Sequence, residues 1–168
     1  LEAIEKGLSK GMAAVGAQFE SGEVFLPELL MAAAGFGAAM EVLKPVIDAQ
    51  KKTVTKLGKV VIGAVKADVH SIGKDIVATV LETSGFEVVD LGVDNPSLHI
   101  IEQAEKNRAD IIALSSLMTT TMPAQKEVID ILREMNLREK YFIILGGGPV
   151  HQEWADQIGA DGYGKSAL

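Results

Sequence analysis

The stretch that decides the fold of this chain is residues 58–73, which read GKVVIGAVKADVHSIG. Its first part, Val60–Val65, is apolar and rich in β-branched residues, as is typical of a strand buried on both faces of a parallel sheet. A polar loop follows at once and leads to Gly73, which allows a tight turn into a helix. Ligands of open α/β sheets bind beyond the carboxyl ends of the strands, so this loop is a candidate site.

The remainder of the chain after residue 73 repeats this rhythm. Short apolar runs predict further buried strands at 87–91, 111–114 and 142–145, with a short last strand at 161–163. Amphipathic stretches between them predict helices at 73–84, 97–107, 122–136 and 150–158. This alternation predicts an α/β fold with a Rossmann-like (flavodoxin-like), doubly wound parallel sheet.

The residues before position 57 have a helical rhythm instead. A first helix is predicted from an apolar stripe that Ser21 and Gly22 end, formed by Ile4, Leu8, Met12, Val15 and Phe19. Pro27 suits the first turn of a second helix that continues to Met40. Pro45 predicts a break or kink before a shorter stretch that reaches about Leu57.

Two domains are therefore predicted: a helical-bundle cap at 1–57 and the α/β domain at 58–168. Because the stripe starts in its middle at Leu1, we expect the cap to lack its first helix or helices.

Composition excludes several classes of function. The chain has 168 residues, and its 16 basic and 23 acidic residues give a net charge of -7. This balance argues against a protein that binds nucleic acid or an anionic membrane surface. No apolar run approaches the roughly 20 residues of a membrane span, so none is predicted. Without cysteine, disulfides and thiolate metal sites are excluded. We expect a soluble, cytoplasmic protein.

The loop after the first strand carries the most specific chemistry. Asp68 and His70 are two residues apart in an extended loop, which places their side chains on the same side of the backbone. The carboxylate can then accept the imidazole Nδ1–H, leaving Nε2 free as a base or a metal ligand. On these residues alone, a solvated histidine near a helix N-terminus is the alternative.

Two more loops at the same predicted edge are unusual. Five hydroxyl residues crowd the stretch Ser115–Thr121, and capping of the next helix accounts for one of them. Three glycines, at 146–148, follow the fourth strand and let a bulky group approach the backbone, although an ordinary glycine turn has the same composition.

Together, Asp68-x-His70-x-x-Gly73, Ser115-x-Leu117 and Gly146-Gly147 resemble the cobalamin-binding domain of the methionine synthase and corrinoid-protein type. The resemblance implies cobalamin as the cofactor, His70 as the lower cobalt ligand, Asp68 as its partner and Thr121 as the hydroxyl of an Asp–His–hydroxyl relay. It also implies contacts to the cofactor, and to a slot for its nucleotide tail, from Val69, Ser71, Ile72, Gly73, Ser115, Leu117, Thr119, Thr120, Gly146, Gly147, Gly148, Gly162, Tyr163 and Gly164.

Residues 19–30 resemble the helical cap over the upper cobalt face in the same family, which implies that Phe19 and Leu26 shield the methyl group. A small bundle joined to such a domain is most similar to corrinoid shuttle proteins of anaerobic one-carbon metabolism. That likeness implies a methyl carrier without catalytic residues of its own. Its implied partners are a substrate-specific methyltransferase, a second methyltransferase for the acceptor and a reductive activase. A cobalamin-sensing or storage module without methyl transfer is the alternative.

Overall fold

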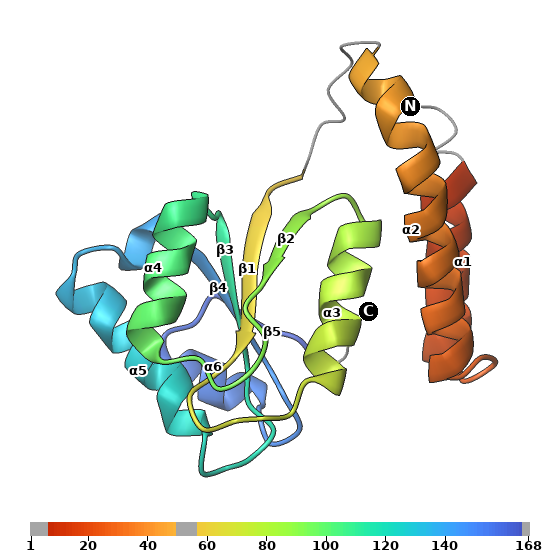
Figure 1. The fold of residues 1–168 in the computed structure, drawn as a ribbon. Helices are drawn as coiled ribbons and strands as arrows, with labels where there is room; N and C mark the ends of the chain where they lie inside the picture. The colour runs from red at the N-terminus through yellow and green to blue at the C-terminus, as the bar shows by residue number, and fades with distance from the viewer. Residues whose placement is uncertain (1–6, 50–56, 166–168) are drawn as a thin grey trace.

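The computed structural model describes residues 7–49 and 57–165. A parallel sheet forms the centre of the part after residue 57, the second region of the chain (Figure 1). Its strands are β1 (Lys59–Ala64), β2 (Glu87–Asp90), β3 (Ile111–Ser115), β4 (Phe142–Gly146) and β5 (Gly162–Tyr163). They are ordered β2-β1-β3-β4-β5, and every pairing is parallel. The predicted Rossmann-like α/β fold is confirmed, with each strand within a residue or two of its predicted bounds.

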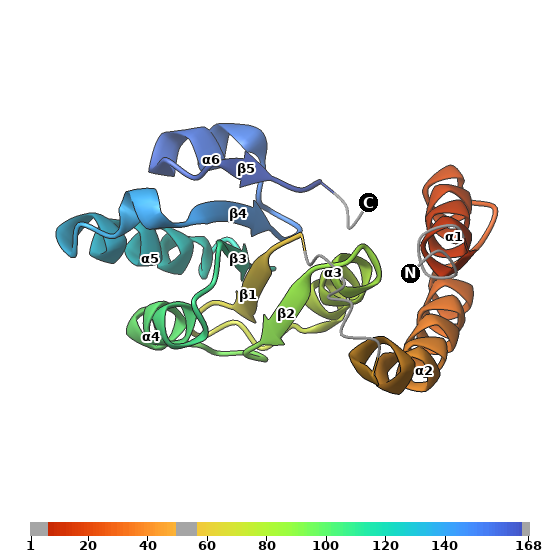
Figure 2. The same cartoon turned by 90° about the horizontal axis from the view of Figure 1, so that it is seen from above.

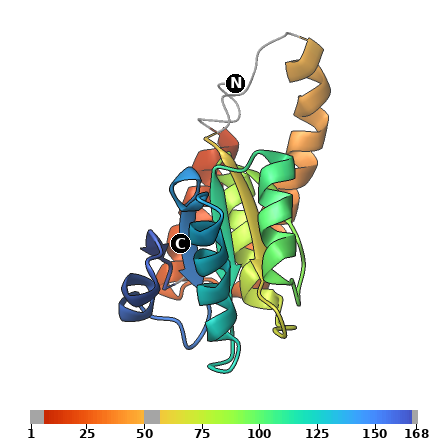
Figure 3. The ribbon, with the colours of Figure 1, turned by 90° about the vertical axis from the view of Figure 1, so that its left-hand side faces the viewer.

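Helices cover both faces of the sheet, but unequally. The helices are α3 (Ile72–Thr83), α4 (Ser97–Asn107), α5 (Met122–Glu134), α6 (Gln152–Ile158) and a short 3-10 helix, η2 (Arg138–Lys140). The sequence did not predict η2, because three residues are too few to show a period. Figures 2 and 3 show α4 and α5 on one face and α3 on the other.

The larger core lies between the sheet and the helices α4, α5 and α6, and includes Ile112, Leu114, Ile143 and Leu145. The smaller core lies beneath α3, where Val60, Ile62 and Ala113 are buried. Because α3 packs on β1 and β2, it leaves the same face of β4 open, and Phe142 there is 52% exposed. Among residues 57–165, the half of this face beyond β3 therefore lacks a covering helix.

The strand order places a topological switch point between β1 and β3. The chain leaves β1 for α3 on one face, and leaves β3 for α5 on the other face. The two connecting loops diverge there and open a crevice at the carboxyl ends of the strands. The Asp68–His70 loop and the hydroxyl-rich loop are these two loops.

Two helices precede the sheet, α1 (Ser9–Ser21) and α2 (Leu26–Ala49). Gly22 ends α1 in a left-handed conformation, with φ 79°, and Pro27 lies in the first turn of α2, both as predicted. Of the predicted break or kink at Pro45, the break is wrong, since α2 continues to Ala49. The kink stays a prediction. A proline removes one helical hydrogen bond donor, and near the end of a long helix that loss does not stop the helix.

The hairpin of α1 and α2 lies on the outer side of α3, against which α2 packs (Figures 1 and 2). Residues 1–6, 50–56 and 166–168 lie outside the described residues. The start of the first helix at Ile4 and most of the helical stretch predicted up to Leu57 fall there. The domain boundary at residue 57 stays a prediction.

By length and composition, Leu26–Leu43 of α2 could cross a membrane, with a mean hydropathy of 1.4. The expectation that no stretch approaches this length is therefore wrong. Its acidic residues, Glu28 and Glu41, lie near the two ends, so the interior of the helix carries no charge. One such helix is weak evidence for a membrane span, because core helices of soluble proteins and signal sequences pass the same test. Only 6% of this stretch is buried, so it is not a core helix in the described part of the chain.

Gly147 sets the spacing of two loops at the carboxyl edge. Its φ is 127°, and a Cβ there would lie 1.8 Å from the carbonyl oxygen of Ser116. We expect Gly147→Ala to lower the free energy of unfolding by roughly 3 to 5 kcal/mol in urea denaturation.

The neighbouring Gly148→Ala is the matched control. A Cβ on Gly148 would meet only the end of the Leu117 side chain, at 3.2 Å, and that side chain can move. We expect a loss below about 1 kcal/mol. Equal losses in the two variants would contradict the steric explanation.

Candidate functional site

The predicted site residues converge on the carboxyl edge of the sheet. Three loops meet there, at residues 65–71 after β1, 116–121 after β3 and 147–151 after β4. Parallel strands end at one edge, so residues about 50 positions apart in the sequence become neighbours.

At the centre of this edge is the carboxylate of Asp68, which is fully buried. Its Oδ1 accepts the backbone N–H of His70 at 3.1 Å and lies 2.9 Å from His70 Nδ1. Its Oδ2 accepts the backbone N–H of Leu117 at 2.7 Å and the hydroxyl of Thr121 at 2.8 Å. The predicted contact of Asp68 with His70 and the Asp–His–hydroxyl arrangement are both present in the structure.

These contacts keep Asp68 ionised. Burial raises the pKa of its carboxyl, but hydrogen bonds from Thr121, from the backbone of His70 and Leu117 and from the His70 ring outweigh burial and lower the pKa to about 2. An ionised carboxylate can only accept, so His70 Nδ1 carries the proton. When the ring is neutral, its lone pair is therefore on Nε2.

The His70 side chain is 45% exposed, and in the described part of the chain no hydrogen-bond partner of its Nε2 is found. Large apolar side chains are exposed on the same loops and at the start of α3, namely Val69, Leu117, Met118 and Ile72. Exposed apolar side chains grouped around one polar atom are typical of a site for a large, mostly apolar ligand.

Small residues form a strip next to this group, on the half of the sheet face that α3 leaves uncovered. Ser115 and Gly146 are register partners at the ends of β3 and β4. Alternation along each strand puts them on the same face as Ala113 and Ile144, which belong to the smaller core. A Cβ added to Gly146 would lie 3.8 Å from the carbonyl oxygen of Gly164.

Gly162 belongs to the same strip, since a Cβ there would meet the Ile144 side chain on this face at 3.4 Å. Four of the residues predicted to line the tail slot thus share one surface: Ser115, Gly146, Gly162 and Gly164.

Other predicted residues lie elsewhere. Tyr163 points to the opposite face, where it packs against the larger core, because neighbours on a strand alternate. The close approach of Gly147 to Ser116 by itself explains why a glycine stands at this position. Thr119 and Thr120 are exposed and take no part in the hydrogen bonds to Asp68.

The structure does not bring the predicted cap over the site. The hairpin of α1, which contains Phe19, and α2, which begins at Leu26, lies on the outer side of α3 (Figure 1). Shielding of a methyl group by Phe19 and Leu26 would need another placement of this hairpin, and it stays a prediction.

Ser116 was not among the predicted site residues. Its side chain is fully buried, and its Oγ lies 2.7 Å from Thr121 Oγ1. Because Thr121 donates to the ionised Asp68, its oxygen can accept from Ser116, which adds a fourth member to the relay. Its position among five hydroxyl residues was the signal, but the sequence does not say which of them is buried.

Lys74 was not predicted either, and its ammonium is buried at the start of α3. Lys74 Nζ lies 2.6 Å from Asp75 Oδ1 and 2.6 Å from Asp90 Oδ2. Burial lowers the pKa of Lys74, but the contacts with the two carboxylates outweigh it and raise the pKa. The charged Lys74 therefore joins the beginning of α3, just after the His70 loop, to the end of β2.

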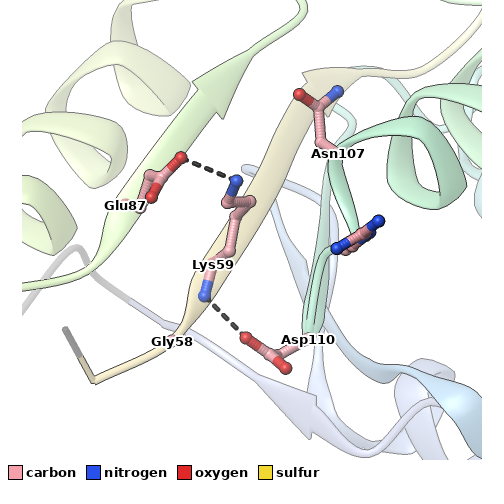
Figure 4. Close-up of a pocket in the computed structure, with 6 residues that line it drawn as sticks. Gly58, Lys59, Glu87, Asn107 and Asp110 are labelled. Carbon is pink, nitrogen blue, oxygen red and sulfur yellow. Dashed lines mark hydrogen bonds and ion pairs between the residues drawn. The ribbon is translucent and has the colours of Figure 1, made fainter.

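A pocket of about 330 Å³ lies at the opposite, amino edge of the sheet (Figure 4). It is lined by Gly58, Lys59, Glu87, Asn107, Arg108 and Asp110. Lys59 pairs there with Glu87 at 2.7 Å and donates its backbone N–H to Asp110 at 2.8 Å. Both carboxylates bond to Lys59 at the start of β1, which is at the opposite edge of the sheet from the His70 loop.

Within residues 7–49 and 57–165, no group of three or more His, Cys, Asp or Glu side chains could hold a metal ion. His70 Nε2 is a single nitrogen donor. Such a donor suits a metal whose other ligands come from a prosthetic group.

Comparison with known proteins agrees with this geometry. Residues 58–168 match the family described as B12 binding domain, and residues 1–44 match a second family with that description. Two relatives from Methanosarcina acetivorans are similar along 99% of the chain. Trimethylamine corrinoid protein 1 is 50% identical over 167 residues, with 77% of its length covered. Dimethylamine corrinoid protein 1 is 48% identical over 166 residues, with 78% covered.

Among solved structures, the methanol:cobalamin methyltransferase complex MtaBC from Methanosarcina barkeri is similar, with a TM-score of 0.85. The sequence identity is 35%, and the match covers 99% of this chain and 63% of the matched one.

The hydrogen bond from Thr121 to Asp68 should make stability depend on pH. In the wild-type protein, the lowered pKa of Asp68 contributes stability above the ordinary value of 3.8, which is lost as the pH falls through about 2. We expect Thr121→Val to lower the free energy of unfolding by about 2 kcal/mol at pH 7 and by progressively less below pH 4. Urea denaturation between pH 3 and 7 measures this. The control is Thr120→Val at an exposed hydroxyl, and a loss in Thr121→Val that does not change with pH would contradict the assignment.

Proposed function

Because the chain belongs to the B12-binding corrinoid proteins, we propose that it carries a methyl group on a bound corrinoid, with His70 Nε2 as the lower ligand of the cobalt. The observation that carries the proposal is the hydrogen-bonded set of Asp68, His70 and Thr121 at the switch point of the sheet. This set leaves one imidazole nitrogen with a free lone pair at an exposed position.

The residues present fit the cofactor. His70 offers one neutral nitrogen donor, and the apolar side chains of Val69, Ile72 and Leu117 are exposed beside it, where a flat macrocycle can cover them. The strip of small residues at Ser115 and Gly146 lies on the uncovered half of the sheet face, where a tail that leaves the macrocycle can pack. When bound, a corrinoid supplies a cobalt centre that can take up and give away a methyl group.

The chain itself contributes orientation and charge. The ionised Asp68 holds the proton of His70 on Nδ1, which fixes the tautomer and the plane of the ring. The N–H of Leu117 and the hydroxyl of Thr121 hold Asp68 in place from the neighbouring loop. The ligand is thus set before the cofactor arrives, which reduces the ordering needed on binding.

The partners follow from the family. Relatives named for trimethylamine and dimethylamine support a methylamine as the class of methyl donor, and the MtaBC complex supports a methyltransferase as a direct partner. The chain is then a carrier subunit and not a catalyst by itself. A second methyltransferase, a reductive activase, the cytoplasm as the location and the absence of membrane contact stay predictions.

The role of His70 can be tested with hydroxocobalamin. We expect His70→Ala to keep the bound corrinoid, because the strip of small residues proposed for the tail is unchanged. The absorbance bands of the corrinoid should shift, and methyl transfer should slow by at least about tenfold. His99→Ala is the matched control, since His99 is an exposed histidine on α4. Absorbance bands identical in His70→Ala and wild type would contradict ligation by His70. A corrinoid that binds through His70 but never exchanges a methyl group with a methyltransferase would favour the sensing or storage alternative.

The proposed role of the strip of small residues in binding the tail can be tested with two corrinoids, cobalamin and a corrinoid without the nucleotide tail. A larger side chain at Gly146 would fill the space towards Gly164, so we expect Gly146→Val to weaken cobalamin binding by roughly tenfold or more. Binding of the tail-less corrinoid should change little. An equal loss of affinity for both ligands in a binding titration would contradict binding of the tail along this strip.

A further inference from the structure

The loop that carries His70 is fastened to the loop between β2 and α4. Val65 forms a bridge with Asn95, whose side chain is buried and donates to the carbonyl of Ala64 at 2.9 Å. The backbone N–H of Asn95 donates to the same carbonyl at 3.1 Å. These bonds fix the residue before Asn95, Asp94, beside the His70 loop.

Asp94 makes a reciprocal pair of hydrogen bonds with that loop. Its Oδ1 accepts the backbone N–H of Ala67 at 2.7 Å, and its own backbone N–H donates to the carbonyl of Asp68 at 2.9 Å. The two bonds hold the peptide groups on both sides of the Ala67–Asp68 link.

The residue held in this way has an unfavourable backbone conformation. Ala67 has φ 65°, in the left-handed region that residues with a Cβ rarely adopt, and Asp94 has φ 53°. Aspartate tolerates this region better than alanine does. A strained conformation persists only where its surroundings hold it, and such positions gather at functional sites.

We propose that Asp94 is a positioning residue for the cobalt ligand: its carboxylate holds Ala67 in the left-handed conformation, which aims Asp68, and through Asp68 the ring of His70. The inference rests on the proposed function, since it concerns the ligand named there. It adds a residue from a different loop, the one between β2 and α4.

The geometry supports this coupling step by step. The turn at Ala67 sets where the chain places Asp68, whose N–H donates to the carbonyl of Val65 at 3.0 Å. Asp68 Oδ1 then accepts both the backbone N–H and the Nδ1 of His70. If Ala67 relaxed to a negative φ, the peptide group before Asp68 would turn, and these bonds would lose their alignment.

A double-variant cycle tests the proposal with two measurements. The first is amide exchange of the His70 N–H, followed by NMR in the chain without corrinoid. The second is the fraction of bound hydroxocobalamin whose absorbance shows an imidazole ligand. The variants are Asp94→Ala, Ala67→Gly and the two combined, with Glu102→Ala as a control that removes an exposed carboxylate from α4.

We expect Asp94→Ala to lower the protection of the His70 N–H by about tenfold, the size of the penalty for an alanine in the left-handed region. The imidazole-bound fraction of the corrinoid should fall as well. Ala67→Gly alone should match the wild type. In the combined variant, protection and ligation should largely return, because glycine adopts this conformation without penalty.

Two results would overturn the proposal: an unchanged His70 amide in Asp94→Ala, or a combined variant as unprotected as Asp94→Ala alone. Asp94→Asn keeps the oxygen acceptor, so it should remain close to the wild type even if Asp94→Ala does not fold. If the wild-type chain binds no corrinoid, the proposed function fails, while the exchange measurement still decides whether Asp94 acts through Ala67.

Discussion

The interaction on which this structure depends is the ionised, buried carboxylate of Asp68. Taking a charge out of water is unfavourable, and four hydrogen bonds from two loops offset it. Because the donors come from His70 on one loop and from Leu117 and Thr121 on the other, the bonds that satisfy the charge also join the loops after β1 and β3. Stability and the orientation of the histidine ring thus have the same physical cause.

The surroundings of this carboxylate follow from close packing of backbones at the carboxyl edge. Gly147 lies so close to Ser116 that no side chain fits between them, which brings the loop after β4 beside the loop after β3. On the other side, the loop between β2 and α4 fastens the His70 loop through Asp94 and Asn95. The site is therefore held on one side by a close approach of two backbones and on the other by side chains that bond to the backbone of the His70 loop. The half of the sheet face beyond α3 is left uncovered.

Much of the fold could be predicted, because strand and helix periods are local properties of the sequence. The strands, the helices of the second region and the end of α1 at Gly22 were predicted close to their bounds. The break at Pro45 was predicted wrongly, because the effect of a proline depends on how much helix surrounds it. The membrane-length apolar helix within α2 was missed, because acidic residues at its ends hide an uncharged interior.

The sequence by itself determined the class of fold, the pairing of Asp68 with His70 and the candidate loops, since these depend on period, on residue type and on a spacing of two residues. Only the tertiary structure decided which hydroxyl residues reach Asp68, that Tyr163 faces the core and that Asp94 holds Ala67. These contacts join residues 27 to 53 positions apart, or depend on which side of a strand a residue lies. A pattern along one strand or loop does not contain that information, because it arises only when the sheet brings the ends of its strands to one edge.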